Sequence, residues 1–264
     1  VKMTTTNVLT RFGFKYEKGG AHIARTMMLD ELRALLDFLR KQEAAKEEYK
    51  DAITEANCLG KRSGKTRILT YRHLVDLYAL DPSLLLYRAL LYFWNKDDEA
   101  QPLLALLCAY TRDAVLRSAA PFILKAQEGT TVTRESLEAF IDSQESNRFS
   151  PATLKSVAQN INATFTKSGH LHGKVRKVRT RAMPTAGSVA YALLLGYLTG
   201  GRGQLLFQTD YIKLLECPFD KAIELAEEAS RKGWITFKRV GDVLEVAFPN
   251  VMHREEMEWL REQN

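Results

Sequence analysis

The sequence has few cysteines and no long apolar run, and each shortage excludes a class of protein. Its 264 residues contain only Cys58, Cys108 and Cys217, which are far apart and odd in number. This spacing excludes a disulfide framework and a zinc ribbon, and it favours a reducing, cytoplasmic location. No run approaches the ~18 apolar residues that a membrane span needs. We therefore expect a soluble protein without membrane contact, in which the apolar runs 84–94 and 189–198 form buried helices.

Acidic residues are absent from one long stretch of the chain. Between Glu145 and Asp210 lie 64 residues without a carboxylate, and nine of them are lysine or arginine. This stretch carries +9, whereas the whole chain has a formal net charge of +6. A phosphate-binding surface should exclude carboxylates because they weaken its attraction for the anion. The pattern therefore predicts nucleic-acid binding, and the alternative is a solvated basic surface that only aids solubility.

The spacing of apolar residues and of helix start signals predicts a mainly α fold in two domains. Residues 1–130 show short amphipathic segments with short breaks, which is typical of a helical bundle. Residues 131–264 are predicted to form winged-helix-like units, each with a helix followed by a hairpin or arm. Ser150-Pro151 is a capping residue followed by proline at the first helical position, and it predicts a helix over 151–167.

Two segments are predicted to form hairpins. Residues 234–249 alternate apolar and polar side chains around Gly241-Asp242, which indicates a hairpin. Residues 170–182 alternate apolar and basic side chains less strictly, and they predict a short strand or hairpin arm. Over 184–249 the order is helix, helix, helix, hairpin, as in a winged helix. The helix over 218–232 carries four carboxylates that would repel phosphate, so we expect this module to pack or to contact protein.

The candidate binding residues lie on the helix 151–167 and in the basic segment after it. Arginine offers forked donors to phosphate oxygens, and lysine offers a mobile charge. Gln159 and Asn162 lie opposite the apolar stripe of the helix, where amides can read adenine edges in a major groove or simply face solvent. Contact with about six phosphates would give a log–log salt dependence with a slope near −5. The predicted DNA-binding residues are Lys155, Gln159, Asn162, Lys167, His170, His172, Lys174, Arg176, Lys177, Arg179 and Arg181.

A secondary basic patch is also predicted. It extends the footprint if the fold brings it alongside the first, and otherwise it is an ordinary charged surface. Its residues are Lys61, Arg62, Lys65, Arg67, Lys238 and Arg239.

The sequence shows no catalytic or metal-binding motif. The segment 60–66 resembles a phosphate-binding loop, but three residues separate its glycines where four are required. His170 and His172 lack a third ligand for a metal, and His22, His73 and His253 are isolated. No nucleophile or carboxylate pair has a recognisable catalytic spacing. We therefore expect no metal, no cofactor and no enzymatic activity.

Five segments share a pattern of apolar and small residues: KGGAHIARTMMLDEL at 18–32, KTRILTYRHL at 65–74, FSPATLKSVAQNINATFTKSGHL at 149–171, PTAGSVAYALLLGYL at 184–198 and GWITFKRVGDVLEVAFP at 233–249. These segments resemble BrxA, the small helical component of BREX phage-exclusion systems. The resemblance covers most of the chain and implies an accessory, non-enzymatic protein of bacterial antiviral defence that binds double-stranded DNA beside other defence proteins. The alternative is a protein–protein or RNA-binding adaptor in the same type of complex.

Overall fold

The computed structural model describes residues 9–39 and 44–263, and the protein is mainly helical, as predicted. The chain divides into two compact units, each assembled from separate stretches of sequence. Unit 1 comprises Val1–Phe14, Ser83–Leu107 and Met183–Asn264, and unit 2 comprises Lys15–Pro82 and Cys108–Ala182.

This division differs from the predicted boundary at residue 130. The expected boundary rested on the turn signal at 129–131, but that segment pairs with residues fifty positions later in the same unit. One true change of unit falls inside helix α6 (Gln101–Arg112), between Leu107 and Cys108. An uninterrupted helix carries no turn or linker signal, so local composition does not reveal this boundary.

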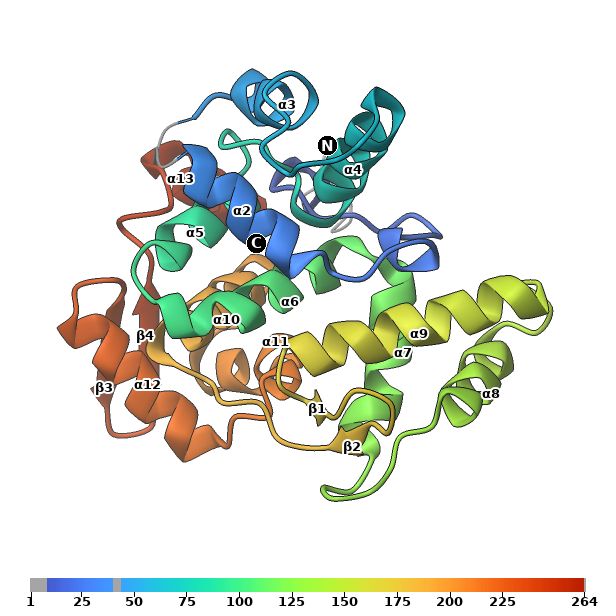
Figure 1. Cartoon of the computed structure of the whole chain (residues 1–264). Coiled ribbons are helices and arrows are strands. Elements are labelled where there is room, and N and C mark those ends of the chain that lie inside the picture. Colours follow the sequence, from blue (N-terminus) through green and yellow to red (C-terminus); the bar gives the residue numbers. More distant parts are fainter. Residues whose placement is uncertain (1–8, 40–43, 264) are drawn as a thin grey trace. The chain divides into compact units, whose positions relative to one another are not determined.

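Unit 1 is built around a helix that is apolar on every side. Every residue of α10 except Tyr197 is buried, which is the expected state of a helix without a polar face. Helices α5 and α12 pack against it, and Figure 1 shows the elements around it. The elements of unit 1 are α5 (Leu85–Trp94), η2 (Asp98–Ala100), the first part of α6, α10 (Ala186–Leu198), η3 (Gly203–Gln208), α11 (Asp210–Leu214), α12 (Phe219–Arg231), β3 (Thr236–Val240), β4 (Val243–Ala247) and α13 (Arg254–Gln263).

The predicted buried helices and the hairpin of unit 1 are confirmed. Helix α5 is buried along most of its length, like α10. Strands β3 and β4 pair antiparallel, with Val240 opposite Val243 at the turn. Arg88 on α5 donates to both carboxylate oxygens of Glu256 on α13 at 2.7 Å, which ties the last helix to this unit. Across the described residues, no helix combines the length and the apolar character that crossing a membrane requires.

Unit 2 contains the residues of the predicted DNA-binding surface. Helix α9 has the predicted bounds, Pro151–Lys167, with the Ser150 side chain capping Thr153 N–H. Figure 1 shows α8 beside α9, with the short strands β1 and β2 at the C-terminal end of α9. The elements of unit 2 are η1 (Ala21–Ile23), α2 (Leu29–Leu39), α3 (Lys46–Thr54), α4 (Gly64–Tyr78), the last part of α6, α7 (Ala114–Lys125), α8 (Arg134–Gln144), α9, β1 (Leu171–His172) and β2 (Val178–Arg179).

A buried polar network holds α9 against the rest of unit 2. His22 Nδ1 lies 2.8 Å from Asp113 Oδ2, and His22 Nε2 lies 2.9 Å from Thr164 Oγ1 on α9. Asp113 also caps α7 by accepting from the backbone N–H groups of Val115 and Leu116. Burial alone raises the pKa of Asp113, but His22 and the hydrogen bonds from His22 and Leu116 outweigh it, so the pKa lies below its ordinary value. The partners of His22 lie 91 and 142 residues away in the chain, so the sequence around His22 does not reveal this network.

Position 20 must be glycine because the Asp113 carboxylate of this network lies close to its backbone. A Cβ at position 20 would lie 1.9 Å from Asp113 Oδ1. The threonine, histidine and carboxylate are hydrogen-bonded in the order found in a catalytic triad. His22 and Thr164, however, are fully buried, and Asp113 is nearly so. Since no substrate can reach them, the network is structural and fixes the position of α9.

Candidate nucleic-acid interface

The basic segment after α9 is a small hairpin joined to a third strand-like segment, and we call residues 170–182 the arm. Strands β1 and β2 pair antiparallel, with Leu171 opposite Arg179. On the other side of β2, Gly129 N–H donates to Arg179 O, and Val132 N–H donates to Lys177 O, both at 2.9 Å. Strand β2 is therefore hydrogen-bonded on one edge to β1 and on the other to the segment 129–132, and the prediction of a hairpin arm is confirmed.

The turn of the arm depends on Gly173. Its φ is +97°, a conformation that side chains rarely adopt, and an added Cβ would lie 2.1 Å from Arg176 O. The carbonyl of Gly173 accepts a hydrogen bond from Lys177 Nζ at 2.7 Å, and Arg176 Nε donates to Thr131 Oγ1 at 2.8 Å. These contacts orient two of the cations of the arm.

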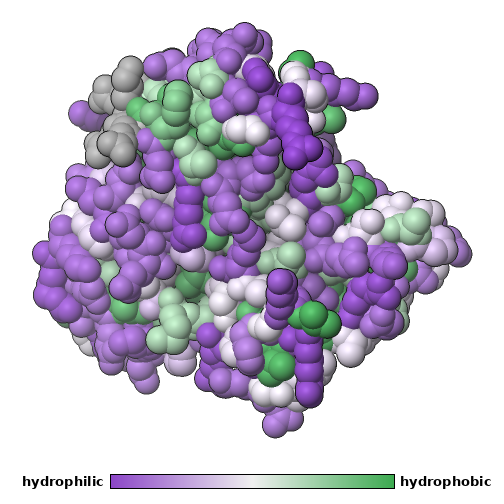
Figure 2. Space-filling model, in the orientation of Figure 1, coloured by the Kyte–Doolittle hydropathy of each residue, from purple (hydrophilic) through white to green (hydrophobic). Residues whose placement is uncertain are grey.

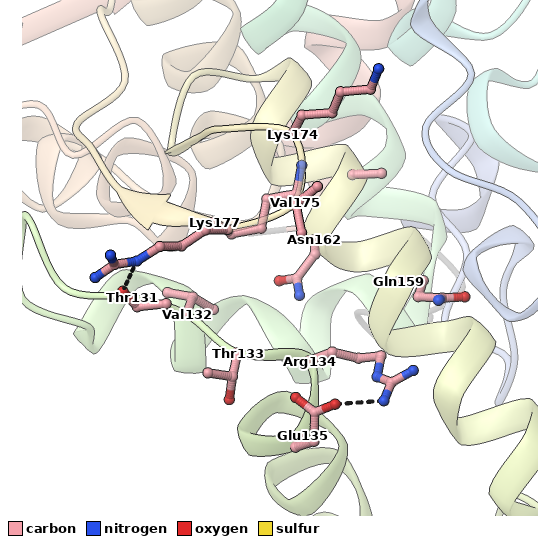
Figure 3. A pocket seen from close by; sticks show the side chains of 12 residues that line it. Thr131, Val132, Thr133, Arg134, Glu135, Gln159, Asn162, Lys174, Val175 and Lys177 are labelled. Carbon is pink, nitrogen blue, oxygen red and sulfur yellow. Dashed lines mark hydrogen bonds and ion pairs between the residues drawn. The ribbon is translucent and has the colours of Figure 1, made fainter.

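The arm, α9 and the start of α8 line a hollow of about 750 Å³ that is open to solvent. Figure 3 shows it between these three elements, with the Asn162 side chain pointing from α9 toward the segment 131–134. Arg134 forms ion pairs with Glu135 and Glu138, so one wall of the hollow is close to neutral. The residues that line it are Thr131, Val132, Thr133, Arg134, Glu135, Gln159, Asn162, Ala163, Lys174, Val175, Arg176 and Lys177.

The structure brings together five of the predicted DNA-binding residues around this hollow: Gln159, Asn162, Lys174, Arg176 and Lys177. Lys155 lies one turn before Gln159 on the exposed face of α9. We call Lys155, Lys174, Arg176 and Lys177 the basic rim. None of the four forms an ion pair with a carboxylate among the described residues. Partial burial lowers the pKa of the Lys177 ammonium, because burial disfavours its charged form.

The surface around the arm is hydrophilic with isolated apolar side chains. In the region where Figure 1 draws the arm, Figure 2 shows long hydrophilic side chains with a hydrophobic spot among them. Val175 at the turn of the arm is almost fully exposed. His172 on β1 is exposed as well, so it remains a candidate for contact beside the rim.

Two predicted contacts are already neutralised by carboxylates from distant stretches of the chain. Lys167 pairs with Asp30, and Arg181 pairs with Glu128 at 3.3 Å. The acid-free stretch is therefore not an acid-free surface. Charge counted along the chain misses these pairs because the fold determines which acids lie nearby.

Three further predicted contacts are buried, which corrects their assignment as DNA-binding surface residues. His170 has no exposed surface, and its ring accepts or donates a hydrogen bond with Ser168 Oγ at 2.8 Å and packs edge-on against Phe165. Arg179 is 2% exposed and donates to the carbonyls of His170 and Thr180. Asn162 is 5% exposed and lies at the base of the hollow. The packing of α8 along α9 covers the face on which Asn162 was expected to meet solvent.

The secondary basic patch is not one surface within a unit. Lys238 and Arg239 lie on β3 of unit 1, whereas the 61–67 residues precede and begin α4 in unit 2. Figure 1 shows α4 and the arm at opposite ends of unit 2. Lys61 pairs with Glu31 at 3.1 Å, and Arg67 donates to Thr54 O and Lys61 O. Arg62 and Lys65 remain exposed without an ion pair among the described residues.

Sequence reasoning missed the far wall of the hollow. Thr131, Thr133 and Arg134 lie beyond the acid-free stretch, and no charge pattern marks them. The one available signal was the helix-capping residue Thr133. It predicted where α8 begins, but it did not predict that α8 lies beside α9.

Comparison with known proteins adds no assignment: no protein-family model and no curated protein matches this chain.

Proposed function

We propose that this protein is a non-enzymatic accessory protein of a BREX-type phage-defence system, and that it binds the backbone of double-stranded DNA through the basic rim. The single observation that supports binding is the basic rim, in which three cations line one hollow on an arm fixed by backbone hydrogen bonds and a fourth lies on α9, with none of the four in an ion pair among the described residues. Preorganised cations lose little freedom on binding phosphate, so they contribute more than mobile ones. The resemblance of five segments to BrxA supports the defence role.

The mechanism is phosphate neutralisation with little base reading. Lys174 and Arg176 on the arm line one side of the hollow, and Lys155 lies on α9 one turn before Gln159, which lines the other side. Phosphates of one strand can contact both sides, which fixes the register of the protein on DNA without specifying sequence. Cytoplasmic location follows from this role and belongs to the same proposal.

A pair of matched double variants tests the proposal. Lys174→Ala/Arg176→Ala removes two rim cations, and Arg62→Ala/Lys65→Ala removes the same two residue types from exposed positions on α4 and the loop before it. At about 0.1 M salt, loss of two phosphate contacts should weaken duplex binding roughly 60-fold. The control variant should bind like the wild type. If the arm variant retains wild-type affinity, or no duplex binds at low salt, the proposal fails.

The test also addresses the alternative adaptor role. A double-stranded RNA competitor of equal length and charge should displace DNA less well, because its A-form geometry spaces the phosphates differently. Preference for RNA, or binding only to other proteins of the same defence operon, would favour the adaptor.

A further inference from the structure

The turn of the arm holds an apolar side chain out in solvent. Val175 is 95% exposed, the highest exposure among the large hydrophobic side chains of the described residues. Isolated exposed apolar side chains are common on protein surfaces, so exposure alone does not indicate a function. The position of Val175 distinguishes it, because its two neighbours in the chain are the rim cations Lys174 and Arg176.

The backbone around Val175 is fixed by its neighbours. Gly173 begins the turn with a φ of +97°, and its carbonyl accepts a hydrogen bond from Lys177 Nζ at 2.7 Å. On the other side of the valine, Arg176 Nε donates to Thr131 Oγ1 at 2.8 Å. The valine is therefore held in water, and covering it with an apolar surface is favourable.

DNA bound by the basic rim lies against Val175. Lys174 and Arg176 are one residue away on either side, so phosphates held by these cations place the duplex over the valine. In Figure 3, Lys174 extends from the turn to one side, whereas the hydrogen bond to Thr131 lies on the other. Arg176 and Lys155 can therefore contact one strand across the hollow, while Lys174 reaches the other strand across a groove.

The minor groove is the one that this turn fits. Strands β1 and β2 have two residues each, and the second edge of β2 is bonded to the segment 129–132, so the arm cannot lie in a major groove as a two-stranded ribbon. Only the turn can enter the DNA. Backbone positions two residues apart, like those of the two flanking cations, are separated by at most about 7 Å. This separation is close to the minor-groove width of about 6 Å and well below the width of about 12 Å of the major groove.

An apolar side chain in the minor groove can act as a wedge. Proteins that bind this groove frequently push such a side chain between two base pairs, which partly unstacks them and kinks the duplex. We propose that Val175 is a wedge of this kind, held by the rim cations on either side, and that the protein partly unstacks the DNA it binds. The proposal rests on the proposed function, because the rim must first bind the DNA backbone. It adds a preference that backbone binding does not require: duplex DNA that is easily unstacked.

The test uses three matched DNA duplexes and the full chain. The first has a central TA step, which unstacks easily, with the fluorescent base 2-aminopurine in place of its adenine. The second has one mismatched pair at that step, so unstacking costs less. The third is the first duplex with uracil in place of every thymine, which removes the methyl groups of the major groove. The fluorescence of 2-aminopurine reports unstacking, and fluorescence anisotropy reports affinity.

We expect the 2-aminopurine fluorescence to rise when the wild type binds, and the mismatched duplex to bind about fivefold more tightly than the paired one. Val175→Ala shortens the wedge, so the fluorescence rise should be lost and the ratio of the two affinities should fall to about one. The slope of log affinity against log salt concentration should stay unchanged in this variant, because no cation is removed. Uracil should leave the wild-type affinity unchanged.

Val240→Ala is the matched control. Val240 is 77% exposed at the turn of the β3–β4 hairpin in unit 1, and its variant should behave like the wild type in both assays. Both substitutions change exposed side chains, so each melting temperature should stay within about 2 °C of the wild type. Loss of the preference in Val175→Ala then reports on the wedge and not on folding.

Three results would overturn the inference: a bound wild-type duplex without a fluorescence rise, a Val175→Ala variant that unstacks DNA like the wild type, or weaker binding of the uracil duplex. The last result would place the valine against thymine methyl groups in the major groove. If the paired duplex binds in any of these cases, the proposed function stands while the inference fails. If no duplex binds, both fail.

Discussion

The affinity for duplex DNA should fall as the salt concentration rises. The slope of log affinity against log salt concentration should reflect how many cations of the basic rim contact phosphate. Each neutralised phosphate contributes about −0.9 to the log–log slope, so the four rim cations predict a slope of about −3.6. Between about 50 and 200 mM salt, the affinity should fall about 150-fold. The sequence alone suggested about six contacts and a slope near −5. The structure lowers this count because Lys167 and Arg181 are paired with carboxylates and Arg179 is buried.

The measurement is a titration of labelled duplex at five or more salt concentrations. For Lys174→Ala/Arg176→Ala, two cations remain, so the slope should be about −1.8 and the affinity should fall only about 12-fold over the same range. The Arg62→Ala/Lys65→Ala control should keep the wild-type slope. An arm variant that binds less tightly with an unchanged slope would refute the reasoning, since it would show that these side chains do not release counterions.

Two further predictions concern stability. Arg179→Ala should lower the free energy of unfolding by about 3 kcal/mol, or the melting temperature by roughly 6 to 12 °C, because two carbonyls of the arm lose a buried donor. The control variant Arg181→Ala, at an exposed position nearby, should change the free energy of unfolding by less than about 0.5 kcal/mol. Equal effects of the two variants would contradict the structural role of Arg179. Asp113→Asn should cost about 3 kcal/mol at neutral pH, because a donor would face the N–H groups of His22. The pKa of Asp113 is depressed in the folded protein, so its contribution is present above the unfolded value near 3.8 and is lost as the pH falls through the folded value. Thermal unfolding between about pH 6 and 2.5 should therefore show a steeper loss of stability for the wild type than for the variant, and parallel curves would be the contrary result.

Local signals predicted the elements of unit 2 that carry the rim. Ser150 and Pro151 fixed the start of α9, and alternation with glycines at 169 and 173 indicated the arm. These patterns are local because a cap, a proline or a turn glycine acts on its own backbone within a few residues. The charge pattern likewise located the three arm cations of the rim.

The exposure of each side chain in the basic segment could not be predicted from local signals. His170, Arg179 and Lys174 occupy similar positions in an alternating basic segment, but only Lys174 is exposed. Tertiary packing decides this outcome: His170 packs against Phe165, and β2, which carries Arg179, pairs with a segment about fifty residues earlier in the chain. The burial of Asn162 was equally hidden, because α8 packs along α9 from another part of the chain.

The interleaving of the two units has a consequence for synthesis and for the design of truncations. The first segment of unit 1 ends at Phe14, and its last segment begins at Met183. Unit 1 therefore cannot be completed until the segments of unit 2 have been translated. At typical ribosome speeds this delay is roughly 10 to 30 s. A fragment that starts at residue 131 would keep α8, α9 and the arm but would lose His22 and Asp113, the residues that hold α9 in place. The hollow should therefore exist only in a chain that retains its N-terminal half, and a binding assay on such a fragment would report on an unfolded surface.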